Sequence, residues 1–407
     1  MSLRADDGSI AALGTEPRPA AQGTAYAVLF AISFCHLLND MMQALVPAIY
    51  PLLKDSYALD FGQIGLITLC FQMTASVLQP VVGAVTDKKP SPRSLAASMG
   101  FTLIGLLLVS RASSFGMLLL AVSLIGVGSA IFHPESSRIA RLASGGRHGF
   151  AQSLFQVGGN FGTAIGPLTA AFIILPAGQK AVAWFAAVAL LAMAILSRVS
   201  SWYTKHQVAR SKAAGPPRET GLSRHQVLLS LAVLTALLFS KSFYTASMSS
   251  YLQFYLIETF KVSVATAQLY LFLFLGALAV GTMAGGPLGD RIGRKYVIWF
   301  SILGVFPFTA ALPYASLMWT GVLIVLIGLI LASAFSAIVV FGQELLPGRI
   351  GMVSGLFFGL SFGIGGVGAA VLGEVADWTS IGTVFKICSF LPIIGVLTIF
   401  LPNMRKH

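Results

Sequence analysis

Long apolar stretches alternate with short polar connections along almost the whole chain. Each stretch is long enough for the roughly 20 apolar residues that a helix needs to cross the hydrocarbon core of a bilayer. The pattern predicts twelve spanning helices, near residues 24–52, 60–86, 93–112, 115–143, 147–176, 180–204, 224–258, 262–288, 295–313, 317–343, 350–375 and 380–402. The sequence therefore indicates an all-α membrane protein with twelve transmembrane helices.

Two polar segments interrupt this pattern and suggest the domain organisation. Residues 1–23 lack the apolar core of a cleavable signal peptide, and residues 205–223 are basic, contain a Pro-Pro pair and fall at the midpoint of the chain. We therefore expect a cytoplasmic tail at 1–23, a six-helix bundle at 24–204, a cytoplasmic linker at 205–223, a second six-helix bundle at 224–402 and a short cytoplasmic tail at 403–407.

Composition supports a membrane protein and gives its orientation. Hydrophobic residues make up 56% of the chain and charged residues only 10%, against roughly a quarter charged in soluble domains. The net charge of +12 does not indicate nucleic acid, because the basic residues stand singly or in short groups between apolar stretches. Of the 26 Lys and Arg residues, twenty fall in connections on the side of the termini and four on the other. This bias predicts that both termini are cytoplasmic.

The three cysteines lie far apart inside apolar stretches, without the spacing of a metal or redox site. We interpret them as small packing residues and expect no metal.

The two halves of the chain share short matching segments. Residues 83–88 (GAVTDK) match the start of residues 286–295 (GPLGDRIGRK), at an offset of 203. A second echo links residues 147–149 (RHG) to residues 349–351 (RIG), at an offset of 202. Two echoes at nearly the same offset indicate that the six-helix halves are duplicated.

These segments carry a family resemblance. The pattern G-x-x-x-D-[RK]-x-G-[RK]-[RK], complete at 286–295, resembles the signature loop of the major facilitator superfamily, and the first copy departs from it with Pro90 where Gly is usual. Residues 162–167 (GTAIGP) resemble a motif of proton-coupled exporters in that superfamily, although Ala170 and Ala171 stand where that motif usually ends in a Gly pair. The resemblance implies the major facilitator fold, a monomer in the bilayer, and export.

Further segments resemble a narrower branch of the superfamily, the bacterial exporters of phosphonate antibiotics. They are residues 36–40, 132–138, 144–149, 155–162 and 343–349. This resemblance implies proton-driven efflux of a small molecule from the bacterial inner membrane, with protons as the coupling ion and no other cofactor.

The superfamily resemblance also gives a role to the acidic residues of the two signature loops. It implies that Asp87 and Asp290 act as latches, which pair with arginines and helix N-termini across the two halves. Arg141 and Arg147 are the expected partners of Asp87. Arg291 and Arg294 are the basic residues beside Asp290. The alternative is that these charges only set the membrane topology.

On the first span, His36, Asp40 and Gln43 recur at spacings of four and three, which places them on one helix face. Charge inside a membrane costs several kcal/mol, so ionisable groups there are functional candidates. We predict that this face lines a cavity and that Asp40, beside His36, carries a proton. The alternative is a structural His–Asp pair.

On the fourth span, His133, Glu135 and Arg138 lie toward the cytoplasmic end, and Glu135 and Arg138 can pair at i,i+3. A carboxylate beside an arginine stays ionised, whereas one in apolar surroundings is protonated more easily. We predict that Glu135, with His133, forms a second proton site nearer the cytoplasm. The alternative is a structural Glu135–Arg138 bridge.

Polar groups on later spans suggest a substrate site. The seventh span places a lysine and three tyrosines on one face, and the twelfth adds another lysine; with Arg138, these cations suit an anionic substrate. The candidates are Lys241, Tyr244, Tyr251, Tyr255 and Lys386, together with Gln43, Gln156 and Asn160. The alternatives are that protein groups already neutralise the cations and that the amides join helices to one another.

The sequence therefore predicts a proton antiporter that exports small anionic drug-like molecules by alternating access. A proton-coupled importer of an organic acid or phosphate ester would use much the same residues. A membrane enzyme is disfavoured, because the chain has no HExxH, GxSxG or P-loop motif.

Overall fold

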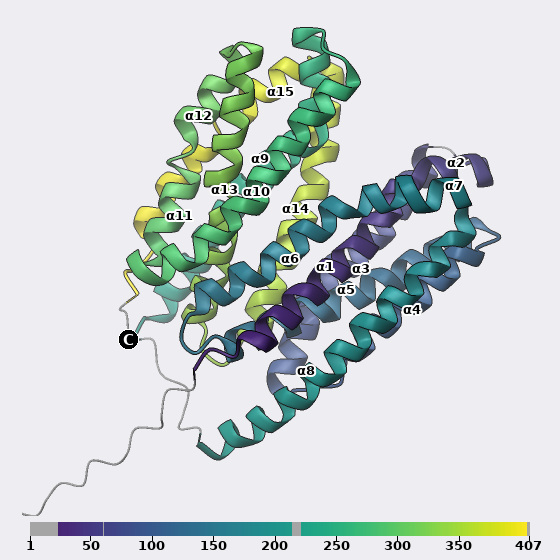
Figure 1. The fold of residues 1–407 in the computed structure, drawn as a ribbon. Coiled ribbons are helices and arrows are strands. Elements are labelled where there is room, and N and C mark those ends of the chain that lie inside the picture. The colour runs from purple at the N-terminus through teal and green to yellow at the C-terminus, as the bar shows by residue number, and fades with distance from the viewer. Residues whose placement is uncertain (1–22, 60, 214–220, 405–407) are drawn as a thin grey trace, which may run out of the picture.

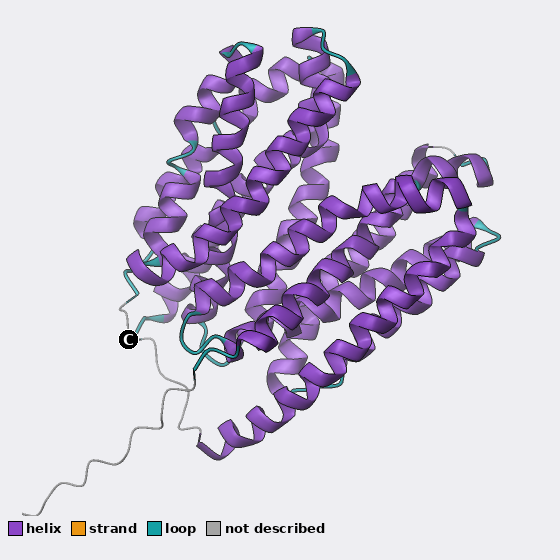
Figure 2. Ribbon diagram, viewed as in Figure 1, coloured by secondary structure: helices purple, strands orange, loops and turns teal. Residues whose placement is uncertain are grey.

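The structure, a computed structural model, describes residues 23–59, 61–213 and 221–404. Nearly all of these residues are helical and none forms a strand (Figure 2). Eleven helical segments of the described chain are long and apolar enough to cross a membrane. The predicted span near 147–176 is not among the eleven; it corresponds to α6 (His148–Thr169) and its continuation. The all-α membrane fold is confirmed, and eleven candidate spans plus α6 are consistent with twelve helices.

The first half of the chain is built from six long helices and short connecting turns. The long helices are α1 (Tyr26–Ala48), α3 (Phe61–Lys88), α4 (Ser94–Arg111), α5 (Phe115–Ala143), α6 and α8 (Phe185–Ala213), and the short ones are α2 (Tyr50–Tyr57), η1 (Ala170–Ile174), α7 (Leu175–Ala177) and η2 (Gln179–Trp184). The helix α8 continues to Ala213, past residue 205, where the linker was predicted to start. Residues 205–213 contain no Gly or Pro to end the helix, and residues 214–220 lie outside the described chain.

The second half has four continuous long helices and two broken ones. The continuous helices are α9 (Arg224–Phe260), α10 (Val264–Ile292), α13 (Leu317–Leu345) and α14 (Ile350–Trp378), and the broken spans are α11 (Arg294–Ile302) with α12 (Phe306–Ala311) and η3 (Leu312–Tyr314), and α15 (Ile381–Cys388) with η4 (Leu391–Phe400). Pro307 and Pro392 lie at the starts of α12 and η4. Neither has an amide hydrogen to continue the preceding helix, which explains both breaks.

The two halves meet at one end of the molecule and part at the other. Figure 1 shows them in contact at one end and diverging toward the other. At the closed end α3 packs against α14, and α6 packs against α10. These two helix pairs join the first half to the second. The domain boundaries given above stay a prediction.

Glycines permit both crossings. A Cβ atom added to Gly83 of α3 would overlap the backbone carbonyl of Gly351 on α14, and one added to Gly286 of α10 would overlap that of Gly149 on α6. All four glycines belong to the repeated segments of the sequence. The backbones approach so closely that only a residue without a side chain fits at these positions.

We predict that Gly286→Val opens the α6–α10 contact. Ser153 is 1% exposed and lies directly beneath Gly286. In open membrane fragments, Ser153→Cys should therefore react with a maleimide roughly tenfold faster in the Gly286→Val background, because a loss of about 1.4 kcal/mol changes a two-state population tenfold.

Gly276→Val, on the same helix, is the matched control, since an added Cβ there meets no atom within 4 Å. Equal labelling rates in the two backgrounds would show that the contact does not hold the closed state.

Candidate functional site

A polar cluster in the described part of the chain joins α1 to α5. The His36 Nε2 atom lies 3.2 Å from Asp40 Oδ2, and the His133 Nε2 atom lies 3.6 Å from Asp40 Oδ1. The two Nε2 atoms are 3.2 Å apart. His36 and His133 are 1% and 0% exposed, whereas Asp40 is 12% exposed. The carboxylate is thus the member of this histidine–aspartate cluster that water can reach.

The histidine contacts show where the hydrogens lie. His36 Nδ1 donates to the backbone carbonyl of Phe155 at 2.7 Å, and His133 Nδ1 donates to that of Ser129 at 2.9 Å. A carbonyl only accepts hydrogen bonds, so each Nδ1 carries a hydrogen, and a neutral imidazole then has none at Nε2. Without a hydrogen between them, the two Nε2 lone pairs would repel each other and the carboxylate. A proton added to one Nε2 atom would supply a hydrogen for the 3.2 Å contact with the carboxylate or with the other Nε2 atom, so the geometry can accommodate one added proton.

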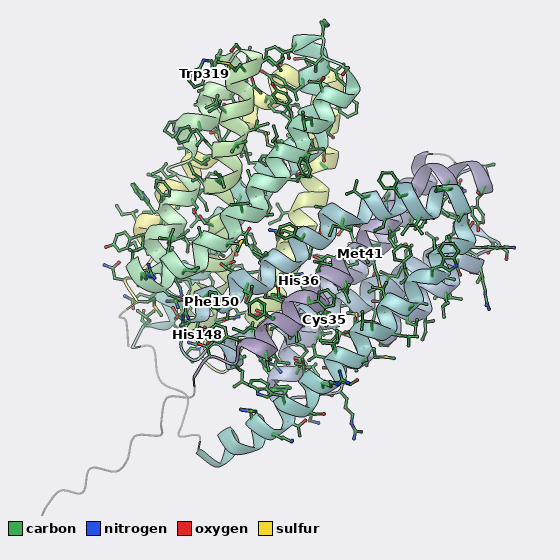
Figure 3. All side chains as sticks on the ribbon, in the orientation of Figure 1. Cys35, His36, Met41, His148, Phe150 and Trp319 are labelled. Atoms are coloured by element: carbon green, nitrogen blue, oxygen red, sulfur yellow. The ribbon has the colours of Figure 1, made fainter. Side chains whose placement is uncertain are left out.

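Neighbouring helices hold the cluster in shape. The Phe155 ring of α6 stacks on His36 with the ring centroids 4.0 Å apart, and the Phe358 and Phe362 rings of α14 lie 5.1 and 5.5 Å from His133. Because α14 belongs to the second half of the chain, the cluster lies where the halves meet. His36, on α1 next to α6, is labelled in Figure 3.

Polar side chains complete the surroundings of Asp40. The amide of Asn39 donates to Oδ1 at 2.9 Å, and that of Gln43 does so at 3.4 Å. Gln43 also accepts from the Ser129 hydroxyl at 3.1 Å. The predicted polar face of the first span therefore exists, with Gln43 supporting the carboxylate.

The same cluster also has the spacing of a metal site, since one ligand atom from each of its three members lies within 4.8 Å of the others. Spacing alone does not make these residues metal ligands. The expectation that the chain binds no metal stays a prediction.

A second group of charges closes the α3–α14 contact. Asp87 accepts hydrogen bonds from the backbone amides of Gly351 and Met352 at 2.9 and 2.8 Å, at the N-terminus of α14. Arg138 lies 2.6 Å from Asp87 and 3.0 Å from Glu135. Glu135 is 0% exposed. A carboxylate at a helix N-terminus is favourable, so this arrangement fits the predicted latch.

The repeat produces the same arrangement at the α6–α10 contact. Asp290 accepts from the backbone amides of Gly149 and Phe150 at 2.9 and 3.0 Å, at the N-terminus of α6. Arg294 lies 3.1 Å from Asp290 and 3.2 Å from Glu344 of α13. Each half of the chain thus places one aspartate against a helix N-terminus of the other half.

Several predicted arginine roles need correction. The guanidinium paired with Asp87 is that of Arg138, which was expected to bind substrate. Arg141 instead donates to Gln343 at 3.1 Å, and Arg147 to the Tyr26 hydroxyl at 2.7 Å. Arg291 is exposed. The i,i+3 spacing of Glu135 and Arg138 identified one ion pair, but it could not show that Asp87, from another helix, shares the same guanidinium.

His133 also differs from the prediction. It was grouped with Glu135 near the cytoplasmic end, but its ring contacts His36 and Asp40. Residues 133 and 135 are two positions apart on a helix and therefore point in different directions.

The predicted substrate residues do not form one site in this state. Tyr251 donates to the Ala369 carbonyl, Tyr255 stacks on Phe385 at 4.3 Å, and Asn160 donates to Thr282 at 3.0 Å. Each of these three joins two helices.

The remaining substrate candidates take no part in these three helix-to-helix contacts. Lys386, expected to be buried, is exposed, and Gln156 is half-buried. Lys241 and Tyr244 are considered below.

Sequence reasoning missed the residues that shape the cluster. Gly159 of α6 leaves room for it, since an added Cβ would lie 2.5 Å from the His36 ring and 2.7 Å from Asp40. Phe155 and Gly159 fall in a segment that carried the family resemblance, but nothing in their spacing shows that they face α1. Ser129 is one helical turn before His133, and that spacing was the signal that could have found it.

The chain resembles characterised and uncharacterised transporters over nearly its whole length. It is 59% identical over 406 residues to the fosmidomycin resistance protein of Escherichia coli (strain K12), covering 97% of this chain and 99% of that protein. It is 42% identical over 389 residues to the uncharacterized MFS-type transporter YfnC of Bacillus subtilis (strain 168), covering 94% of each.

Solved structures show the same fold at low sequence identity. They include the transporter FucP in the outward conformation, with a TM-score of 0.71 at 16% identity over 93% of this chain and 98% of that one. They also include the human organic anion transporter MFSD10 (TETRAN), with a TM-score of 0.73 at 17% identity over 95% of this chain and 100% of that one. The family model of the Major Facilitator Superfamily matches residues 32–370. The chain is therefore a multi-pass membrane protein that belongs to the Major Facilitator Superfamily.

Proposed function

We propose that this chain is a proton-driven antiporter that exports small anionic drug-like molecules, with the phosphonate antibiotic fosmidomycin as the leading candidate. The substrate assignment is supported by the 59% identity to a fosmidomycin resistance protein over nearly the full length of both chains. Export needs no chemical change in the substrate, so the chain is proposed to act as a carrier and not as an enzyme.

The observation that carries proton coupling is the histidine–aspartate cluster. Its hydrogen bonds fit one added proton, it is kept from water except at Asp40, and it touches rings from the other half of the chain. A buried group that takes up and releases a proton at such a contact favours one arrangement of the halves over another. Glu135, buried beside Arg138 at the α3–α14 latch, is proposed as a second proton site.

The proposal of alternating access rests on the difference between the two ends of the molecule, one closed and one open. The closed end carries the latches, and we propose that it faces the cytoplasm of a bacterium, as the Lys and Arg bias of the sequence supports. The described state would then be open to the outside, where protons enter and substrate leaves. In this proposal the carrier is a monomer of the inner membrane, with protons as its only coupling ion.

Substrate flux under an imposed pH gradient tests the direction of coupling. In vesicles containing the purified protein, an antiporter should accumulate fosmidomycin on the acidic side. Accumulation on the opposite side would favour the second candidate, a proton-coupled importer. Recovery of chemically unchanged fosmidomycin is expected in both cases, and a modified product would contradict the proposal that the chain is a carrier.

Asp40→Asn should abolish proton exchange, since an amide keeps the shape of the side chain but cannot bind the extra proton. We expect the protection that the protein gives cells against fosmidomycin to fall to the level of cells without it, at equal amounts of protein in the membrane. Glu258→Gln, which removes an exposed carboxylate on α9, is the control and should protect fully. Full protection by Asp40→Asn would exclude Asp40 as the proton site.

Gly159→Ala should disturb the cluster without removing any of its members. The added methyl would displace His36 or Asp40, and small errors in the geometry of a proton-transfer site cost on the order of tenfold to a hundredfold in rate. Fosmidomycin efflux from vesicles, measured at saturating substrate, should slow by that factor. Gly100→Ala, where an added Cβ meets no atom within 4 Å, should leave the rate unchanged. Equal rates for both variants would argue against a role for the close α1–α6 contact.

A further inference from the structure

Lys241 of α9 is a half-buried cation inside a membrane span. Among the described residues its ammonium group has neither a hydrogen bond nor an acidic partner. It lies over the Phe335 ring of α13, with 5.3 Å from Nζ to the ring centroid. Contact with an aromatic face offsets only part of the cost of removing water from a cation. An unpaired charge at this depth is costly, so an anion beside it would stabilise the charge.

Other cations of the spans differ from Lys241 in this respect. Arg138 is held by Asp87 and Glu135, and Arg294 by Asp290 and Glu344. Lys386 is exposed. Within the described chain Lys241 thus combines partial burial, a position inside a span and the lack of a protein anion.

The helix that carries Lys241 offers a second unpartnered polar group. The Tyr244 hydroxyl, three residues further along α9, is buried and has no hydrogen-bond partner among the described residues. Buried hydroxyls are rarely left without a partner in a protein interior. The lysine supplies a positive charge that can pair with an oxyanion, and the tyrosine supplies a hydroxyl that can donate a hydrogen bond to it.

A short chain of rings connects this lysine to the histidine–aspartate cluster. Phe335 lies 5.0 Å from Phe358, and Phe358 lies 5.1 Å from His133, measured between ring centroids. The lysine belongs to the second half of the chain and the histidine to the first. Phe335 and Phe358 thus lie between the lysine and the histidine.

We infer that the ammonium group of Lys241 binds the anionic group of the transported molecule, a phosphonate or a similar oxyanion, and that it selects charged over neutral substrates. This inference rests on the proposed function, because it assigns the substrate site of the same carrier. The histidine–aspartate cluster holds the proton, and Lys241 holds the substrate anion. A substitution in the cluster should therefore change proton exchange, whereas a substitution of Lys241 should change the affinity for the substrate anion.

Binding to the purified protein in lipid nanodiscs tests this assignment. The two probes are fosmidomycin and its uncharged phosphonate diester, each titrated by calorimetry. We expect Lys241→Gln to weaken fosmidomycin binding roughly tenfold to a hundredfold, as for the loss of one hydrogen bond to a charged group. Affinity for the diester should be unchanged, which would also show that the variant is folded. Lys241→Arg should retain most of the preference for the charged probe.

Lys386→Gln is the matched control, since it removes an exposed lysine from a span of the same half and should leave both affinities as they are. An unchanged fosmidomycin affinity in Lys241→Gln would overturn the inference. The proposed function fails in a different measurement, namely if the wild-type protein does not transport fosmidomycin in vesicles.

Discussion

The histidine–aspartate cluster depends on one constraint, that charge inside a membrane must be matched locally. Asp40 is held by two Nε2 atoms whose own Nδ1 hydrogens are fixed on backbone carbonyls, so the tautomer of each ring is determined by the helices around it. The amides of Asn39 and Gln43 also donate to the carboxylate. Gly159 and Phe155 of α6 keep the rings in place.

The same constraint explains the closed end of the molecule. Asp87 and Asp290 satisfy the amides at the N-termini of α14 and α6, and each shares an arginine with a glutamate. Close helix crossings at glycine bring these groups within reach. Closure thus depends on contacts that water would replace once the halves separate, which makes the closed state sensitive to small changes in charge. The helix α5 connects the closed end to the histidine–aspartate cluster, because it carries Glu135 only two residues after His133.

Much of this could be predicted from the sequence, and the limits have physical causes. Apolar length gave the spans, the repeat located both latches, and helical spacing placed His36, Asp40 and Gln43 on one face. Sequence spacing gives neighbours only within one helix. It could not show that His133 of α5 contacts Asp40, or that Arg138 pairs with Asp87. Nor could it show that Tyr251 and Asn160 form hydrogen bonds to other helices. Lys386 was expected inside because its neighbours are apolar, but one face of an apolar helix is exposed at the surface of its bundle, and Lys386 lies on such a face. The ends of α8 and the breaks at Pro307 and Pro392 depend on local backbone chemistry that a hydrophobicity pattern does not resolve.

The most direct test of the account is the number of protons that the purified carrier exchanges when substrate binds. In weakly buffered solution with a pH indicator, saturating fosmidomycin should displace close to one proton per wild-type protein, and none from Asp40→Asn. Fosmidomycin binding that leaves the pH unchanged in the wild-type protein, across the pH range in which the protein transports, would contradict the claim that the cluster on α1 and α5 couples proton movement to export.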